Sequence, residues 1–223
     1  MNIPTSDNQS NSKGFVDFEK IPQKKVKSLL QSEQLFTVEA FAKLKAICYQ
    51  KENPLPYRAH FKAFLVKKDS TIVWKTYTTI APSETWKGKM VTFGCQYDRQ
   101  QGKITYLEDD FSGLAAGQLL FMNLRLLGGL INVAVSHEIM EVNETGKFIK
   151  ICYLEKGASI GTQLLTFTST AEGFTRIEHK TIYRSNSAFR DKILYPTLHG
   201  KAIAEFHENI RKKIELAFCD DFK

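Results

Sequence analysis

The feature that most constrains the fold of this chain is a long succession of strand-like segments followed by one long helical segment. Between Arg58 and Ser185, stretches rich in Val, Ile, Phe, Thr and Tyr alternate with short turns that contain Gly, Asn and Asp. Regular spacing of this kind predicts an antiparallel meander of seven to nine strands. The segments expected as strands are 58–66, 71–80, 90–97, 103–107, 117–126, 130–142, 148–154, 160–168 and 175–183.

The final element has a different periodicity. From Pro196 to Phe218 one apolar stripe follows a helix, with Lys and Glu on the opposite side and Pro196 at a favourable first position. A sheet and a helix that each have one apolar face bury both faces when they pack together. We therefore predict an α+β fold in which a curved antiparallel sheet grips a long C-terminal helix (196–218) and leaves a cavity between them.

The N-terminal region is expected to be helical beyond a disordered tail. Residues 1–14 are polar and hold too few apolar side chains to offset the entropy of ordering. Apolar residues at helical spacing then predict a short helical N-terminal extension over 21–51, before Pro54 ends it. In a chain of 223 residues, 15–223 is expected to form a single domain of extension, sheet (58–185) and helix.

Charge and cysteine usage exclude several classes of protein. The formal net charge of +7 comes from basic residues spread along the chain, so no nucleic-acid partner is expected, and nucleic-acid binding is kept as a minor alternative. The four cysteines form no Cys-x-x-Cys pair and the N-terminus lacks the apolar run of a signal peptide, which favours a reduced, cytoplasmic protein. The longest apolar stretch, 119–135, is interrupted by Asn123, Arg125 and two glycines, so no membrane span is expected.

Strand and helix periodicity place several histidines on faces expected to point inward. His137 shares its row with apolar residues of 130–142, and His179 lies in one row with Tyr183. On the final helix, a rotation of about 100° per residue puts His199 within about 20° of the apolar stripe. The candidate ligand-binding residues are therefore His137, His179, Tyr183, His199, Ile203, Phe206 and Ile210.

Two interpretations of the inward histidines stay open. Each can be a structural side chain that is hydrogen-bonded to a neighbour in the core. Together they can instead form the polar end of an otherwise apolar pocket that orients a ligand. Three histidines can also hold a catalytic zinc, but sequence does not establish their convergence, and neither a metal nor a cofactor is expected. Of the other histidines, His60 is expected to face water and His207 to lie at the edge of the apolar stripe.

The C-terminal third carries a family resemblance. The segments YLEKGASIGTQLLTFTSTAEGFTRIEHKTIYRS and FRDKILYPTLHGKAIAEFHENI resemble the last strands and closing helix of helix-grip proteins of the Bet v 1/START-like (SRPBCC) superfamily, over about 89–218. That resemblance implies one strand, two short helices, six strands and a long helix, with a cavity for an apolar ligand. The helical extension and the strand-like segment 71–80 depart from this pattern and leave a closed calycin-like barrel as the alternative fold.

The sequence supports three hypotheses about function. The first is binding of an apolar or amphipathic small molecule, of lipid, polyketide or isoprenoid type, between sheet and helix. The second, which the resemblance implies, is an enzyme of cyclase or dehydratase type that uses a cavity histidine as general acid or base, with no catalytic residue assigned. In the third, the extension over 21–51 packs on a partner or on a second copy, which would give a homodimer.

Overall fold

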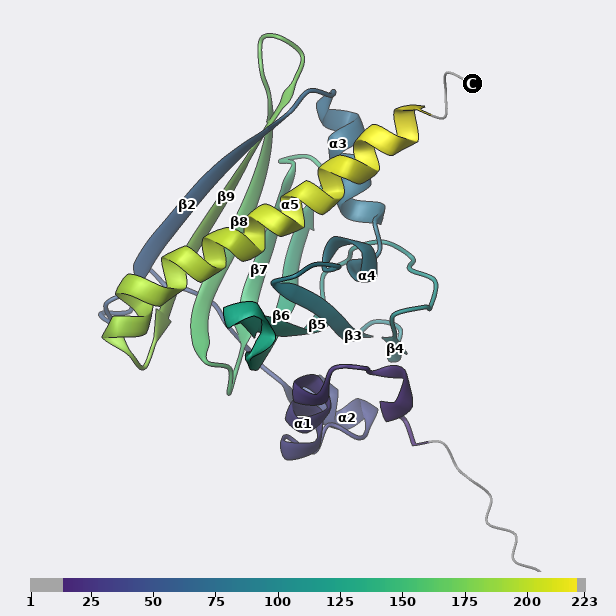
Figure 1. The fold of residues 1–223 in the computed structure, drawn as a ribbon, viewed down its shortest axis with the longest axis vertical. Helices are drawn as coiled ribbons and strands as arrows, with labels where there is room; N and C mark the ends of the chain where they lie inside the picture. Colours follow the sequence, from purple (N-terminus) through teal and green to yellow (C-terminus); the bar gives the residue numbers. More distant parts are fainter. Residues whose placement is uncertain (1–13, 220–223) are drawn as a thin grey trace, which may run out of the picture.

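The computed structural model describes residues 14–219 and contains one nine-stranded antiparallel sheet that wraps around a long helix (Figure 1). The strands are β1 (Ala46–Ile47), β2 (Arg58–Val66), β3 (Val91–Asp98), β4 (Lys103–Thr105), β5 (Gln118–Leu126), β6 (Ile131–Asn143), β7 (Phe148–Leu154), β8 (Ser159–Ser169) and β9 (Thr175–Ser185). Their order is β2-β9-β8-β7-β6-β5-β3-β4, and β1 pairs with β7 beside this path. Within the described residues the edge strands β2 and β4 do not pair with each other, so the sheet is open and the calycin-like barrel is excluded.

The long C-terminal helix is confirmed. Helix α5 (Tyr195–Cys219) continues from a π-helical turn, η3 (Arg190–Leu194), and crosses the inner face of the sheet (Figure 1). Ile210 and Ile214 of α5 share one apolar cluster with Ile177 of β9. The predicted α+β architecture, a curved sheet gripping a helix, is therefore present. The shorter helices are η1 (Phe18–Lys20), α1 (Lys24–Ser32), α2 (Val38–Lys43), α3 (Ser70–Thr79), α4 (Pro82–Thr85) and η2 (Leu127–Gly129).

A carboxylate on α5 fixes this helix to the edge of β3. Glu205 accepts hydrogen bonds from the backbone N–H groups of Lys89 (2.6 Å), Met90 (3.0 Å) and Val91 (3.2 Å). A Cβ atom on Gly88 would lie 1.9 Å from Glu205 Oε1, so only glycine lets the carboxylate approach this closely. The contact sets where the middle of the helix lies on the sheet.

The prediction of a strand over 71–80 is wrong, because this segment forms α3. Its Thr, Val and Ile content favours β-structure, but the Asp69 side chain caps the helix by accepting from the Thr71 backbone N–H at 2.8 Å. With α4, the segment supplies the pair of short helices that the family resemblance implies after the first long strand. The side chains that this helix buries at helical spacing are Val73, Trp74 and Tyr77.

The N-terminal extension packs on the outer face of the same sheet, opposite to α5. In β5, Leu119 and Phe121 belong to the apolar cluster under the extension, whereas Leu120 and Met122 belong to the cluster on the inner face. The helical part is confirmed but shorter than predicted, since α2 ends at Lys43 and the chain then extends into β1.

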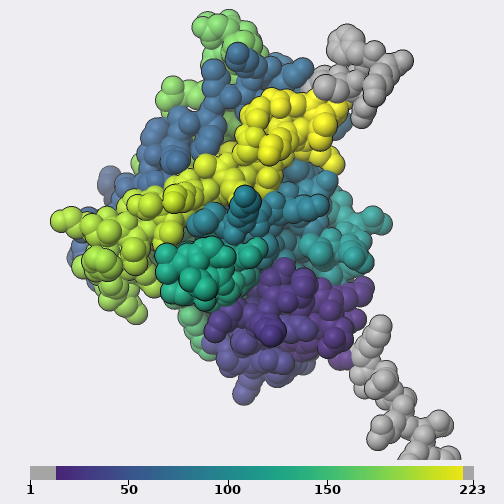
Figure 2. All heavy atoms as spheres, in the orientation of Figure 1, coloured from purple at the N-terminus to yellow at the C-terminus, as the bar shows by residue number. Residues whose placement is uncertain are grey.

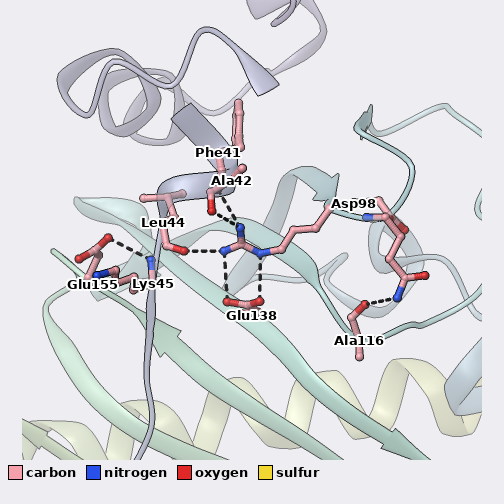
Figure 3. A network of polar contacts seen from close by, with 10 residues as sticks. Phe41, Ala42, Leu44, Lys45, Asp98, Ala116, Glu138 and Glu155 are labelled. Carbon is pink, nitrogen blue, oxygen red and sulfur yellow. Dashed lines mark hydrogen bonds and ion pairs between the residues drawn. The ribbon is translucent and has the colours of Figure 1, made fainter. Parts of the chain in front are cut away.

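The Arg99 side chain binds the chain where α2 ends, and Figure 3 shows the carbonyl groups of Phe41, Ala42 and Leu44 that it contacts. Its guanidinium donates to the carbonyl oxygens of Phe41 (3.2 Å), Ala42 (2.7 Å) and Leu44 (2.5 Å). The same group pairs with the carboxylate of Glu138, with Nε 3.0 Å from Oε1. The side chain thus satisfies carbonyl groups at the end of α2 that a continued helix would have bonded itself.

A disulfide bond joins Cys48 to Cys152, and it corrects the prediction of a fully reduced protein. The two cysteines are 104 residues apart in sequence. They come together because β1 pairs with β7 and places Ile47, which precedes Cys48, opposite Tyr153, which follows Cys152. Cys95 is a buried free thiol, and burial raises its pKa to about 12. The disulfide therefore ties the end of the extension covalently to the sheet.

Two remaining expectations concern the membrane and the tail. Among residues 14–219 no helix is long and apolar enough to cross a membrane. The expected disordered tail, 1–14, lies outside the described residues except for Gly14. The division into a tail and a single domain over 15–223 stays a prediction.

Candidate functional site

A cavity of about 200 Å³ lies between the inner face of the sheet and the first half of α5. Most of its wall is apolar and comes from inward-facing residues of β5 and β6 and from one face of α5. The turn between β7 and β8 and the residues of η3 reach its other side. The apolar wall includes Met122, Leu124, Val133, Val135, Leu198, Ala202 and Ile203.

Four polar side chains form one corner of this cavity, which we call the polar corner: His137, Tyr153, Gln163 and Tyr195. Gln163 Nε2 donates to His137 Nε2 at 3.0 Å and to the Tyr153 hydroxyl oxygen at 3.4 Å. The Tyr153 hydroxyl also forms a short hydrogen bond with the Tyr195 hydroxyl. A ligand in the cavity would therefore meet apolar groups along most of its length and hydrogen-bonding groups at this end.

A buried polar chain continues from the polar corner to the far side of α5. Gln163 Oε1 can only accept, so His179 Nε2 carries the proton in the 2.9 Å bond between them. His179 Nδ1 then accepts from His207 Nε2 at 3.0 Å, and His207 Nδ1 accepts from the Tyr77 hydroxyl at 2.6 Å. Each donor in this chain meets one acceptor, which is what a buried polar network needs to be stable.

Burial keeps every group of this network neutral. It lowers the pKa of His137 to about 4 and that of His207 to about 3, since the charged imidazolium would lose its hydration. The pKa of His179 falls well below its usual value for the same reason, with repulsion from His207 added. Burial likewise raises the pKa of Tyr153 and of Tyr195 well above their usual range. At neutral pH the polar corner thus offers uncharged donors and acceptors.

Aromatic stacking fixes the start of α5 beside the cavity. The Tyr195 ring lies between the rings of Tyr183 and His199, with centroids 3.6 Å and 4.7 Å away. His60 is half-buried rather than in water, because its Nδ1 lies 3.3 Å from His199 Nδ1. His207 is buried rather than at an edge, because Phe64 of β2 stacks on its ring at 3.9 Å.

The seven predicted ligand-binding residues fall into two groups. Those in the cavity wall are His137, His199 and Ile203. Those packed behind the wall are His179, Tyr183, Phe206 and Ile210. All seven lie between the sheet and the helix, and the ligand-binding role of each stays a prediction.

The residues behind the wall position those in front. His179 orients Gln163 through the hydrogen bond to its side-chain oxygen. Tyr183 is 1% exposed, supports the Tyr195 ring and donates its hydroxyl proton to the Asp191 carbonyl oxygen at 2.7 Å. Phe206 stacks on Trp86 with 4.5 Å between the ring centroids, at the edge of the cavity. These contacts make the wall rigid where the strands meet the helix.

Sequence reasoning did not identify Gln163, Tyr153 or Tyr195. Gln163 lies in the same alternating row of β8 as the buried Leu165 and Phe167, so a polar residue in an inward row was available as a signal. Tyr153 lies in a strand whose bounds were predicted correctly, and it shares an alternating row with Ile149 and Ile151. A polar group in that apolar row was therefore available as the same signal. Tyr195 was missed because the helix was expected to begin one residue later.

The side chains of the polar corner are joined to one another by hydrogen bonds. Among the described residues, no three His, Cys, Asp or Glu side chains lie where they could hold one metal ion. His199 Nε2 is buried and has no hydrogen-bond partner in the described part of the chain. With these groups the cavity can accept the apolar part of a small molecule and form hydrogen bonds between uncharged groups with its polar end.

No protein-family model and no curated protein matches the sequence. Solved structures do match. A norcoclaurine synthase from Thalictrum flavum, in complex with dopamine and hydroxybenzaldehyde, is similar at a TM-score of 0.54 and 13% identity, over 76% of this chain and 96% of that one. Major latex-like protein 151 from Panax ginseng is similar at a TM-score of 0.51 and 12% identity, over 70% of this chain and 97% of that one. A protein of Thermus thermophilus is similar at a TM-score of 0.52 and 10% identity, over 72% of this chain and 99% of that one.

These matches and the observed topology define a helix-grip fold. This chain has the order of strand, two short helices, successive antiparallel strands and long helix that the resemblance implies, and it matches these solved structures at TM-scores above 0.5. The sequence resemblance to the Bet v 1/START-like superfamily is therefore confirmed at the level of the fold. The TM-scores of 0.51–0.54 establish a common fold, whereas a shared fold at 10–13% identity says nothing about a common reaction.

Proposed function

We propose that this protein binds an apolar or amphipathic small molecule, of lipid, polyketide or isoprenoid type, in the cavity between the sheet and α5. The observation that carries the proposal is the composition of the wall: apolar side chains along its length and one corner of hydrogen-bonding groups that are held neutral. Binding sites for small molecules commonly combine these two features, because apolar area supplies affinity and a few polar groups fix the orientation. The solved structure of a norcoclaurine synthase with two aromatic molecules is consistent with this use of the fold.

The polar corner predicts which end of a ligand it prefers. A hydroxyl or carbonyl group placed beside Gln163 and Tyr195 would exchange hydrogen bonds in surroundings that exclude most water. An anionic group would find no cation among the four residues of the corner, since His137 is neutral at pH 7. Arg190 also lines the cavity, but its guanidinium donates to the Ala158 carbonyl oxygen outside the corner. A neutral oxygen on an apolar skeleton therefore fits best.

A pair of simple probes tests this preference. Naphthalene and 2-naphthol differ by one hydroxyl group, so the ratio of their dissociation constants isolates the hydrogen bond at the corner. We expect wild-type protein to bind 2-naphthol about tenfold more tightly than naphthalene and the Gln163→Leu variant to lose that preference. Native mass spectrometry of the purified protein should also find a co-purified ligand. Equal affinities of wild-type protein for both probes would contradict the role of the corner.

An enzyme of cyclase or dehydratase type that uses a cavity histidine is the alternative. A proton-transfer residue works best with a pKa near the working pH, whereas burial lowers the pKa of His137 to about 4. For that reason we place binding first. Substituting His179 and His199 separately by Gln, with ligand affinity and turnover measured in parallel, distinguishes the two. Turnover that falls while affinity is kept would support the enzyme.

Location and assembly complete the proposal. A disulfide between Cys48 and Cys152 is typical of oxidising compartments and weighs against the predicted cytoplasmic location. The extension over 21–51 packs its apolar side chains on its own sheet. These side chains are therefore not available as the interface of the predicted homodimer. Light scattering on the full chain tests the homodimer, and labelling of free thiols in cell extracts tests the oxidation state.

A further inference from the structure

Exposed apolar side chains gather in two segments beside the cavity. The first segment is the turn between β5 and β6, where Leu127 is 69% exposed and Leu130 87%. The second leads from β9 into α5, where Phe189 is 65% exposed and Ile193 50%. We call the whole set the apolar rim: Leu127, Leu130, Ile131, Phe189, Ile193 and Leu194.

The apolar rim borders the cavity on both sides. Leu126, which precedes the first segment, lines the cavity, and so do Arg190 and Leu194 of the second. Figure 2 shows both segments on one face of the molecule, the teal-green turn and the yellow-green start of α5. A molecule that leaves the cavity between them would meet these apolar side chains first.

Basic residues outnumber acidic ones in the two segments that carry the rim. In 124–133 and 186–201 the sequence contains two arginines and two lysines, but only one acidic residue, Asp191. That carboxylate is 4% exposed and accepts from the Ser185 backbone N–H at 2.8 Å, so it does not face outward. The basic residues of these segments are Arg125, Arg190, Lys192 and Lys201.

We infer that the apolar rim docks on the surface of an anionic lipid bilayer, with the mouth of the cavity facing the membrane. Apolar side chains that enter the interface and basic side chains that meet acidic headgroups are the two contributions that hold peripheral proteins on such membranes. An acidic lipid surface complements both the apolar and the basic side chains of these segments. A purely apolar partner would leave the basic side chains without counter-charges, and a basic partner would repel them. This inference goes beyond ligand binding, because docking needs no molecule in the cavity. Where a ligand is bound, docking lets it pass between bilayer and cavity without crossing water.

Vesicle co-sedimentation tests the docking. The probes are vesicles of phosphatidylcholine alone and of phosphatidylcholine with phosphatidylserine, at low and high salt. Wild-type protein should bind the vesicles that contain phosphatidylserine, and binding should weaken as salt rises. Leu130→Glu and Phe189→Glu, one in each segment, should each weaken binding about tenfold or more. The matched control is Leu216→Glu, since Leu216 is 63% exposed on α5 but lies far along the helix from the rim.

The outcomes separate docking from ligand binding. The Ala202→Phe variant, which fills the cavity, should bind vesicles like wild-type protein, while the rim variants should keep their affinity for 2-naphthol. No binding of wild-type protein to phosphatidylserine vesicles overturns the inference, whatever the cavity binds. Equal loss of vesicle binding in Leu130→Glu and Leu216→Glu overturns it as well. Binding of wild-type protein to an acidic protein but not to vesicles also overturns it. Circular dichroism confirms that each variant is folded.

Discussion

The two faces of the sheet are stabilised in different ways. On the outer face, an apolar cluster packs between the extension and the sheet: the Phe41 ring stacks on Tyr97 at 4.7 Å between centroids and meets Phe121 edge-on at 5.8 Å. A hollow beside this cluster, between residues 22–25 and the side chains of Asn123 and Arg125, is open and polar. On the inner face, α5 packs densely near α3 but leaves a cavity near its own start. The same strands serve both faces, because successive residues point to opposite sides.

This difference suggests how the fold tolerates a hollow interior. A cavity forgoes dispersion contacts and the burial of apolar area that would otherwise favour folding. The outer face adds a buried apolar cluster, the Arg99–Glu138 pair and a disulfide to the same strands. We therefore expect the free energy of unfolding to depend mostly on the outer face and ligand affinity on the inner one.

Removal of the disulfide is expected to have the largest effect. Its loop spans 104 residues, and a cross-link of that span restricts the unfolded chain by about 4 kcal/mol. Urea unfolding of wild-type protein should therefore shift strongly when reductant is added. The Cys48→Ser/Cys152→Ser variant should be destabilised by the same amount and should not respond to reductant. A wild-type midpoint that reductant leaves unchanged would refute the stabilising role of this bond.

A matched pair of leucines compares the two faces directly. Leu30 is 0% exposed in the outer cluster, whereas Leu198 is half-buried and already borders the cavity. Leu30→Ala should lower the free energy of unfolding by about 3 kcal/mol, and Leu198→Ala by less than about 1 kcal/mol. Denaturant titration of both variants measures the difference. Equal losses would mean that the inner wall is as tightly packed as the outer one.

Arg99→Lys sharpens the same comparison on the polar side. A lysine cannot bind three carbonyl oxygens and a carboxylate at once, so Glu138 and the end of α2 would lose partners. We expect a loss of about 2 kcal/mol in the free energy of unfolding with no change in affinity for 2-naphthol. Arg184→Lys, on an arginine outside this network, is the control. Loss of ligand affinity in Arg99→Lys alone would show that the two faces are coupled.

The buried histidines predict a pH dependence that belongs to the inner face. In the unfolded chain each imidazole takes up a proton below its ordinary pKa of 6.5, whereas burial lowers the pKa of His137 to about 4 and of His207 to about 3. The unfolded state then binds more protons than the folded one, so stability falls as pH decreases from 6.5 toward 4. The slope should be about 1.4 kcal/mol per pH unit for each neutral imidazole.

The His207→Gln variant isolates one of these contributions. Its amide can still bond to both Tyr77 and His179 but does not titrate. Between about pH 6 and 5 its stability should decline less steeply than that of wild-type protein, by about the slope of one imidazole. Stability of wild-type protein that stays flat over this interval would contradict the neutral state of the buried polar chain.

Much of the fold was predictable because alternation and turns mark strands well. The bounds of β2 and β7 agree with the sequence prediction to the residue. The segment 71–80 failed because its composition favours a strand, while the capping Asp69 and the burial of every third or fourth residue decide for a helix. Local composition and tertiary packing disagree there, and packing prevails.

The site was less predictable, since it depends on contacts between distant elements. The inward direction of His137 and His179 follows from alternation alone. The burial of His207 does not, because it depends on Phe64 and Tyr77 from two other elements. The pairing of Cys48 with Cys152 requires the path of β1 across the outer face, which no local pattern indicates.

The most direct test of the cavity as a binding site is to fill it from α5. Ala202 is buried in the cavity wall, and Ala217 lies exposed on the same helix, so a phenylalanine at either position is the same chemical change. The dissociation constant of 2-naphthol should rise about tenfold or more in Ala202→Phe and stay within about twofold of wild type in Ala217→Phe. Equal affinities in the two variants would show that the ligand binds elsewhere and that the cavity is not the site.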